Sequence, residues 1–292
     1  MSDSVASLRH KITSAEELES VVRTMKAMAA SSITQYENAV RSLDDYYRTV
    51  QLGLSACFRQ DQLSGSIIDR TVPGTAAIGV IVFGSDQGLV GQFNETMVEF
   101  VENTLSPLSG NKTLWAVGER LQSRLAETNL KLEVGFTLPN SINAVTALVG
   151  QILIEIEARR EEGSIERVYL FHNSPHSSSI YTPVSQQLLP LDQVWQHDLA
   201  SILWPVSNLP EVMPDQQGTL RALVREYLFV SIFRACAESL ASENASRLAA
   251  MQRAEKNIDE LQDDLNLTFH RLRQSSIDEE LSDVLSGFEA LS

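Results

Sequence analysis

Three glycines after an apolar run at residues 76–83 are the first place where this sequence could bind a phosphate. The stretch VFGSDQGLVGQFN places Gly84, Gly88 and Gly91 four and three residues apart. A dinucleotide-binding turn needs a different spacing and an acidic residue after a second strand, and a Walker-type loop needs a Gly-Lys dipeptide. The sequence has neither pattern. We therefore interpret the stretch as a structural turn between a strand and a helix.

Histidines and acids are the next candidates for chemistry. His172 and His176 are four residues apart, but Pro175 prevents a helix from presenting both on one face. We interpret them as histidines of a surface loop rather than metal ligands. A group of acids lies on an expected helix: Asp259, Glu260, Asp263 and Asp264. We interpret it as a stripe that faces solvent or a partner rather than as an acid/base pair.

Nucleophilic catalysis has no support in the sequence. There is no Gly-x-Ser-x-Gly elbow, and Cys57 and Cys236 have no histidine nearby. Two distant cysteines form neither a disulfide framework nor a zinc ligand set, so we expect both to be small buried apolar residues. We predict no catalytic residue, no metal and no cofactor. A mechanical or architectural function is favoured.

Charge and hydropathy exclude further classes. The 292 residues carry a formal net charge of −15, which argues against nucleic acid because phosphate contacts need clustered Lys and Arg. No stretch approaches the roughly 20 apolar residues of a membrane span. The start, MSDSVASLRHKI, has no basic segment leading into an apolar run, so no secretory signal is expected. We expect a protein that is cytosolic or bound to a membrane through partners.

The N-terminal part predicts one long helix. From Val5 to Leu54 there is no proline, and apolar or small residues recur with a mean spacing of about 3.5, the heptad period of coiled coils. Leu8, Ala15, Leu18, Val22 and Ala29 belong to this stripe. Such a helix would be roughly 75 Å long. A stripe of that length does not fit into one compact core, so a coiled coil is expected.

The central part alternates strand and helix patterns. The expected strands lie at residues 76–83, 113–117, 131–138, 166–172 and 180–191. Strand–helix repeats of this size imply a mostly parallel sheet covered by helices. The short link before the last strand favours an antiparallel addition. We also expect Ser141 to cap the helix that follows it.

The C-terminal part predicts a second long helix, because Thr219 to Ser286 contains neither glycine nor proline. At 68 residues it would be roughly 100 Å long. The two helices could pair antiparallel, with the longer one continuing alone past the end of its partner. Small residues would let the helix axes approach closely: AMAASS (27–32) in the first helix, and Ala241, Ser242, Ala245, Ala249 and Ala250 in the second.

The fold class is therefore α/β, with a long antiparallel coiled coil of N- and C-terminal helices and a central Rossmann-like α/β domain. The expected parts are residues 1–58 for the first helix, 75–205 for the central domain and 215–292 for the second helix.

Five stretches in the same order resemble the gamma subunit family, the central stalk of rotary F-type ATP synthases. TMKAMAASS resembles the family's K-A-M-x-M-V-A-A-x-K, and FGSDQGLVGQFN its S-D-R-G-L-C-G-x-x-N turn. SQQLLPL resembles the end of its last central strand. SLASENASRLAAMQRAEKN and LRQSSIDEELSDVLSGFEAL resemble the two signatures of its long C-terminal helix.

The resemblance implies a noncatalytic rotor shaft that couples ion flow to ATP synthesis or hydrolysis. Its partners would be the alpha and beta subunits of the catalytic hexamer, the epsilon subunit and the membrane c-ring. One copy per complex is expected, peripheral on the cytoplasmic side of a bacterial inner membrane. The resemblance suggests these partner contacts: Arg23, Lys26, Arg271, Arg273, Gln274, Asp278, Glu280, Asp44, Tyr46 and Trp204.

Several positions depart from the family pattern. SITQYEN (32–38) lacks the cations usual there, and Gln87 replaces a common arginine. Asp278 replaces a threonine and Phe288 an alanine. These changes suggest a divergent bacterial branch, such as the alternate sodium-translocating ATPases.

Two other classes stay open on the sequence alone. A nucleotide-binding α/β domain with helical dimerisation arms would bind nucleotide through its isolated central domain. A coiled-coil scaffold unrelated to rotation would associate with a second copy of itself, whereas a shaft pairs its two helices within one chain.

Overall fold

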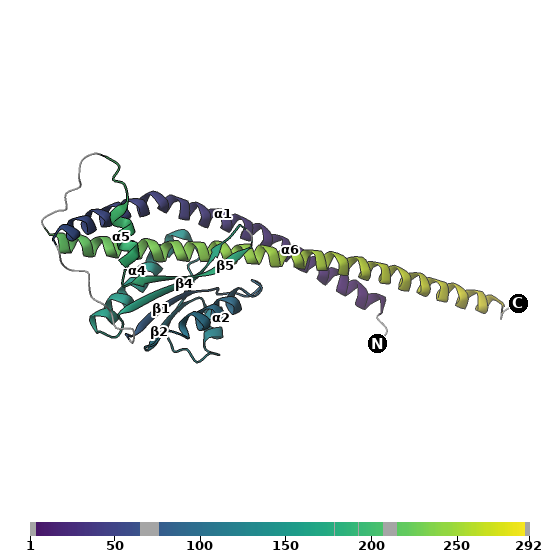
Figure 1. The fold of residues 1–292 in the computed structure, drawn as a ribbon. Helices are drawn as coiled ribbons and strands as arrows, with labels where there is room; N and C mark the ends of the chain where they lie inside the picture. The colour runs from purple at the N-terminus through teal and green to yellow at the C-terminus, as the bar shows by residue number, and fades with distance from the viewer. Residues whose placement is uncertain (1–3, 65–75, 178, 192, 207–214, 290–292) are drawn as a thin grey trace. The chain divides into compact units, whose positions relative to one another are not determined.

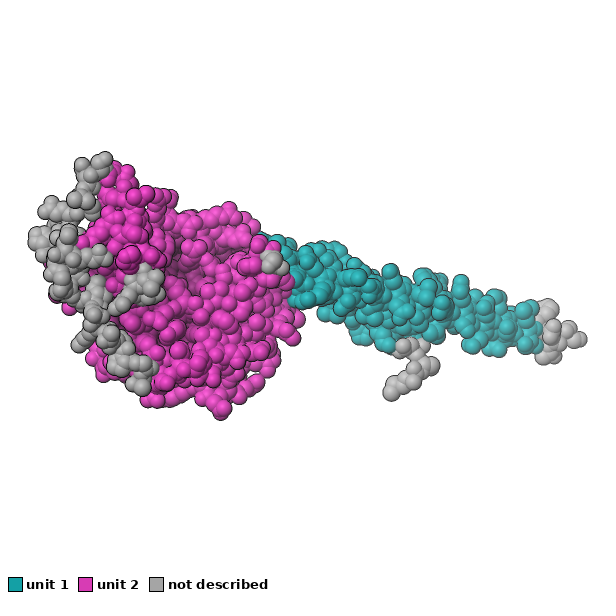
Figure 2. Space-filling model, viewed as in Figure 1, with its two compact units in different colours: residues 1–30, 247–292 teal, residues 31–246 magenta. Residues whose placement is uncertain are grey.

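The computed structural model describes residues 4–64, 76–177, 179–191, 193–206 and 215–289. The chain divides into two compact units, which are described separately. Residues 1–30 and 247–292 form the first unit, and residues 31–246 form the second (Figure 2). Two long helices contribute to both units: α1, Val5–Ser64, and α6, Gln216–Glu289.

The first unit consists of the start of α1 and the end of α6, which lie side by side up to the beginning of α1, and α6 then continues alone (Figure 1). Lys26 of α1 pairs with Glu255 of α6 at 2.5 Å, and Gln262 donates to Glu19 at 3.2 Å. Arg9 lies over the ring of Phe269, 5.8 Å from its centroid. Since the partner number in α6 falls as the number in α1 rises, the helices are antiparallel, and this prediction is confirmed.

A heptad row of α1 forms the buried seam. Leu8, Ala15, Val22 and Ala29 are spaced seven residues apart and are at most 9% exposed. Leu18, which the sequence pattern also placed in the stripe, is 56% exposed, so that expectation was wrong. A single partner helix covers one side of α1 within this unit, so residues at the margin of the stripe stay in solvent.

In the second unit, a five-stranded sheet has the order β3-β2-β1-β4-β5. β1 pairs with β2 and β4, and β2 with β3, all in parallel, while β5 is antiparallel to β4. This confirms the predicted mixed sheet. The strands are β1 Ile78–Phe83, β2 Lys112–Val117, β3 Leu132–Phe136, β4 Arg167–Pro175 and β5 Tyr181–Leu189. The shorter helices are α2 Phe93–Leu105, α3 Glu119–Leu125, α4 Ile142–Glu161 and α5 Gln193–Ser201.

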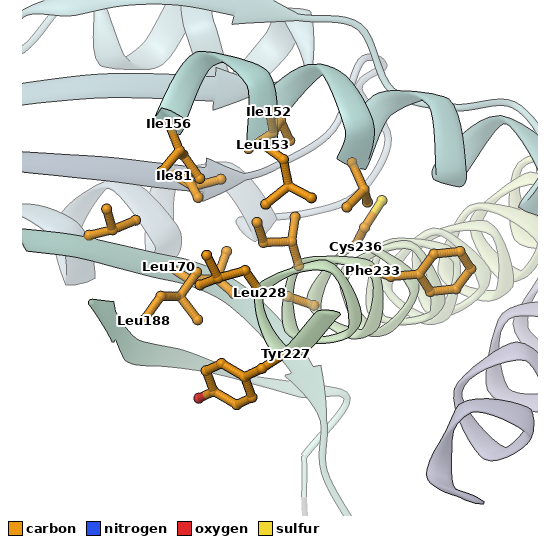
Figure 3. Close-up of a cluster of buried hydrophobic side chains, with 14 of the residues drawn as sticks. Ile81, Ile152, Leu153, Ile156, Leu170, Leu188, Tyr227, Leu228, Phe233 and Cys236 are labelled. Carbon is orange, nitrogen blue, oxygen red and sulfur yellow. The ribbon is translucent and has the colours of Figure 1, made fainter. Parts of the chain in front are cut away.

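Side chains of β1 point alternately to the two faces of the sheet, and each face has its own hydrophobic core. Val80 and Val82 pack with α2 and α3 on one face, and Ile81 and Phe83 pack on the other face with α4 and the long helices. Figure 3 shows part of the second core, with side chains from the sheet, α4 and α6 converging. Both cysteines are buried, as expected, and burial raises the pKa of the Cys236 thiol.

The long helices also contact each other in the second unit. Tyr46 donates from its hydroxyl to Glu226 at 2.6 Å, and Asp44 pairs with Arg234 at 3.5 Å. A Cβ on Gly53 would lie 2.9 Å from Leu223 Cδ2, so the backbone of α1 approaches that side chain closely.

Helix beginnings differ in how they are capped. Asp215 precedes α6, and its carboxylate accepts a hydrogen bond from the amide of Gly218 at 2.9 Å. Ser141 occupies the N-cap position of α4, but its hydroxyl makes no capping bond, so the predicted side-chain cap was wrong. The extended backbone at Ser141 still allows its carbonyl to accept from Ala144 at 3.1 Å.

Candidate functional site

The glycine-rich turn after β1 is held by side chains of its own domain. Ser85 and Asn94 exchange two hydrogen bonds, from the Ser85 amide at 3.0 Å and from the Asn94 amide nitrogen at 2.8 Å. The Asp86 carboxylate accepts from the backbone amides of Glu119 at 2.9 Å and Leu138 at 3.2 Å. The backbone amides that follow β2 and β3 therefore already donate to the Asp86 carboxylate, and they are the donors that a bound anion would need. This supports the structural interpretation of the turn.

His172 contradicts its interpretation as a surface-loop residue. It lies in β4, is 6% exposed, and its Nε2 is 2.9 Å from Glu238 Oε2 of α6. An ionised carboxylate only accepts, so Nε2 donates in this pair. No local pattern indicates this pairing, because the two residues are 66 positions apart.

Glu238 collects hydrogen bonds from two elements. Ser174 of β4 donates to Oε2 at 2.8 Å, and Arg234, one turn earlier in α6, donates from Nε to Oε1 at 2.8 Å. Burial alone would raise the pKa of Glu238. The hydrogen bonds from His172, Arg234 and Ser174 outweigh it and lower the pKa to about 2.

Two serines continue this contact along α6. Ser242 donates to the carbonyl of Asn173 in β4 at 3.0 Å, and Ser246 donates to the carbonyl of Val90 in the glycine-rich turn at 2.6 Å. Together with Arg234 and Glu238 these residues recur every four positions, so they lie on one face of the helix. We call Arg234, Glu238, Ser242 and Ser246 the polar ladder.

The polar ladder corrects the expectation for Ser242. We expected this small residue to serve close packing of the long helices. Ser242 and Ser246 instead bond to carbonyls of the central domain. The sequence holds no clear signal for these bonds, because other polar residues of the same stretch, Ser239 and Asn244, lie outside the four-residue spacing.

The predicted contact residues of the first unit are either paired within the chain or exposed on α6. Arg23 pairs with Glu19 on the same helix, and its side chain is 66% exposed. Lys26 is engaged by Glu255 within the chain. The remaining residues lie exposed on α6: Arg271, Arg273, Gln274, Asp278 and Glu280.

The predicted contact residues of the second unit lie on two elements. Asp44 and Tyr46 are exposed on α1 and bond to α6 as described above. Trp204 is half-buried in the segment after α5, beside Leu203, which is 91% exposed. Arg59 of α1 holds this segment, since its guanidinium donates to the carbonyls of Ala200, at 2.6 Å, and Ile202.

No helix among residues described in the structure combines the length and the hydropathy needed to cross a bilayer.

Comparison with known proteins covers almost the whole chain. A family model described as ATP synthase matches residues 4–291. An ATP synthase gamma chain from Granulibacter bethesdensis is 29% identical over 300 residues, covering 99% of each chain. One from Histophilus somni is 26% identical, covering 97% of this chain and 98% of its own.

Solved structures share the fold. A chain of the Euglena gracilis mitochondrial ATP synthase superposes with a TM-score of 0.67 at 16% identity, covering 98% of this chain and 94% of that one. A chain of the Tetrahymena thermophila enzyme gives 0.57 at 22% identity, covering 80% and 99%. The family match extends from the first described helix to the end of the last. The chain therefore belongs to the family of ATP synthase gamma chains, the noncatalytic central-stalk subunit, or rotor, of F-type ATP synthases.

Proposed function

We propose that the paired segments of α1 and α6 in the first unit lie inside a hexamer of alpha and beta subunits. The end of α6 supports this most directly. Ile277, Leu281, Val284 and Leu285 are 45–70% exposed in the single chain, beside the exposed charges of Arg271, Arg273, Asp278 and Glu280. Exposed apolar side chains gathered on one helix end indicate a protein surface that covers them.

Arg23 and Lys26, two of the predicted contact residues, have different functions in this proposal. The side chain of Arg23 is 66% exposed and pairs with Glu19 on its own helix, which leaves most of its guanidinium accessible to an acidic loop of the hexamer. Lys26 already neutralises Glu255. Lys26 therefore acts chiefly within the coiled coil, and Arg23 acts toward the partner.

The second unit carries the proposed contacts to the membrane part. Asp44, Tyr46 and the segment around Trp204 would face the c-ring, with the epsilon subunit beside them. The exposure of Leu203 and Val206, at 91% and 61%, supports a protein contact at this segment. Each exposed charged contact contributes a free energy on the order of 1 kcal/mol or less, so a stable interface needs many of them.

The complete proposal is a shaft that turns with the c-ring and drives the catalytic subunits through successive conformations. This couples ion flow to ATP synthesis or hydrolysis. The subunit would be peripheral, on the cytoplasmic side of a bacterial inner membrane. The sodium-translocating branch stays a prediction, because bacterial gamma chains of several genera resemble this chain at a similar 26–29% identity.

The test is to purify the intact complex through a tag on this chain and count its subunits by native mass spectrometry. One copy for every three beta subunits is the expected result. Recovery of a homodimer without catalytic subunits would favour the coiled-coil scaffold and reject the proposal. ATP hydrolysis by the isolated chain would contradict the noncatalytic function.

A further inference from the structure

The polar ladder joins three successive turns of α6 to β4 and to the glycine-rich turn after β1. Glu238 accepts from His172 and Ser174, Ser242 donates to Asn173, and Ser246 donates to Val90. All of these residues belong to the second unit. Arg234 extends the ladder to α1, because its guanidinium also pairs with Asp44 at 3.5 Å.

Hydrogen bonds constrain a helix in a way that apolar contacts do not. Burial of apolar surface is non-directional, so it holds α6 against the sheet without selecting one position along the axis. Hydrogen bonds weaken steeply with distance and angle. A register shift of one residue moves the side chains about 1.5 Å along the axis and rotates them by about 100° around it. Such a shift would break every bond of the ladder at once.

We propose that the polar ladder fixes the axial and rotational register of α6 on the central domain. Glu238, Ser242 and Ser246 are then positioning residues of the rotor. Torque applied to the sheet reaches the long helix through them, and Arg234 passes part of it to α1. The inference rests on the chain's place as the rotor of an ATP synthase.

A simpler explanation is that these bonds only satisfy buried polar groups. A control on α6 separates this explanation from a function in register. Ser239 is fully buried on the same helix, yet its hydroxyl has no hydrogen-bond partner within the described part of the chain. Ser239→Ala removes a buried hydroxyl without removing a ladder bond. The double variant Ser242→Ala/Ser246→Ala removes two ladder bonds, and the change in side-chain volume at each site is the same as in Ser239→Ala.

The experiment measures the torsional stiffness of the complete complex. Catalytic subunits are fixed to a surface, a probe is attached to the central domain, and the variance of its angle is recorded without ATP. The double variant should increase this variance while its unloaded ATP hydrolysis stays unchanged. Ser239→Ala should leave both at the wild-type level. Ser242→Ala/Ser246→Thr, which restores one hydroxyl donor, should return the variance toward wild type.

Equal variance in the double variant and the wild type would overturn the proposal, as would an equal increase in Ser239→Ala. If the double variant does not assemble, amide hydrogen exchange on the full isolated chain replaces the stiffness measurement. Exchange at residues 238–246 should then quicken by about 30-fold, the effect of two ordinary hydrogen bonds. A similar increase across the whole sheet would show general destabilisation and reject a function in register.

Discussion

Lys26 Nζ of α1 lies 2.5 Å from Glu255 Oε2 of α6, with side-chain exposures of 34% and 23%. The pair joins the two helices across their seam, three residues before the buried Ala29. A residue that the family resemblance marked as a contact to other subunits is thus engaged inside the chain. The seam of the first unit is held by apolar heptad residues and by cross-helix polar pairs at its margin.

Reversing one charge of this pair should destabilise the coiled coil. Lys26→Glu places two carboxylates together and should lower the free energy of unfolding by about 0.5–1 kcal/mol, the range of partly exposed ion pairs. Lys26→Glu/Glu255→Lys should recover most of the loss. Urea denaturation of the isolated chain, at low and high salt, measures both. Lys256→Glu is the control, because Lys256 pairs within α6 at 3.7 Å and is 78% exposed. A loss in the control as large as in Lys26→Glu would contradict the cross-helix function.

Neighbouring residues of α1 test the small-residue seam. Ala29 is 2% exposed, and Met28 beside it is 66% exposed. Ala29→Trp forces the helices apart and should cost at least about 1–3 kcal/mol, the usual range for overpacking. Met28→Trp should change stability by no more than about 0.5 kcal/mol. Thermal unfolding followed by circular dichroism distinguishes them. Equal tolerance of both substitutions would refute a tightly packed seam at Ala29.

The sequence predicted the long helices well because their signal is periodic and local. Leu8, Ala15, Val22 and Ala29 follow the heptad, and the absence of proline allows one continuous helix. The mostly parallel sheet followed from the alternation of strand and helix patterns, and the antiparallel β5 from the short connection before it. The stretch without glycine or proline marked only part of the second helix, since it begins at Thr219, whereas α6 begins at Gln216, directly after the cap made by Asp215.

The polar contacts of the second unit could not be predicted in the same way. His172 and Glu238 are far apart in sequence, and neither position has a local pattern that names its partner. The serines at 242 and 246 fit close helix packing as well as hydrogen bonding to a sheet. Which of the two applies depends on the face of α6 that meets β4, and this is decided by the tertiary fold.

Stability at acid pH should depend on Glu238. Its pKa is about 2 in the folded chain and ordinarily 4.5. A lowered carboxyl pKa contributes stability that is complete above about pH 4.5 and is lost as the pH falls toward 2. The full contribution is about 3 kcal/mol, of which roughly 2 kcal/mol is lost by pH 3. Urea denaturation at pH 6 and pH 3 should therefore show a steeper loss in the wild type than in Glu238→Gln. Parallel losses in the two proteins would show that the carboxylate makes no such contribution.

Apolar residues at the end of α6 should matter to assembly and not to the isolated chain. Leu281 is 56% exposed and Val284 is 70% exposed, so Leu281→Asp removes little buried area and should shift the free energy of unfolding by less than about 0.5 kcal/mol. If the catalytic hexamer covers this surface, the same substitution buries a charge against it and should lower the yield of complex severalfold. Glu279→Asp, at an exposed acidic position two residues earlier, is the matched control and should assemble normally. Native mass spectrometry of the tagged complex measures the yield. Full assembly of Leu281→Asp would mean that the end of α6 stays in solvent within the complex.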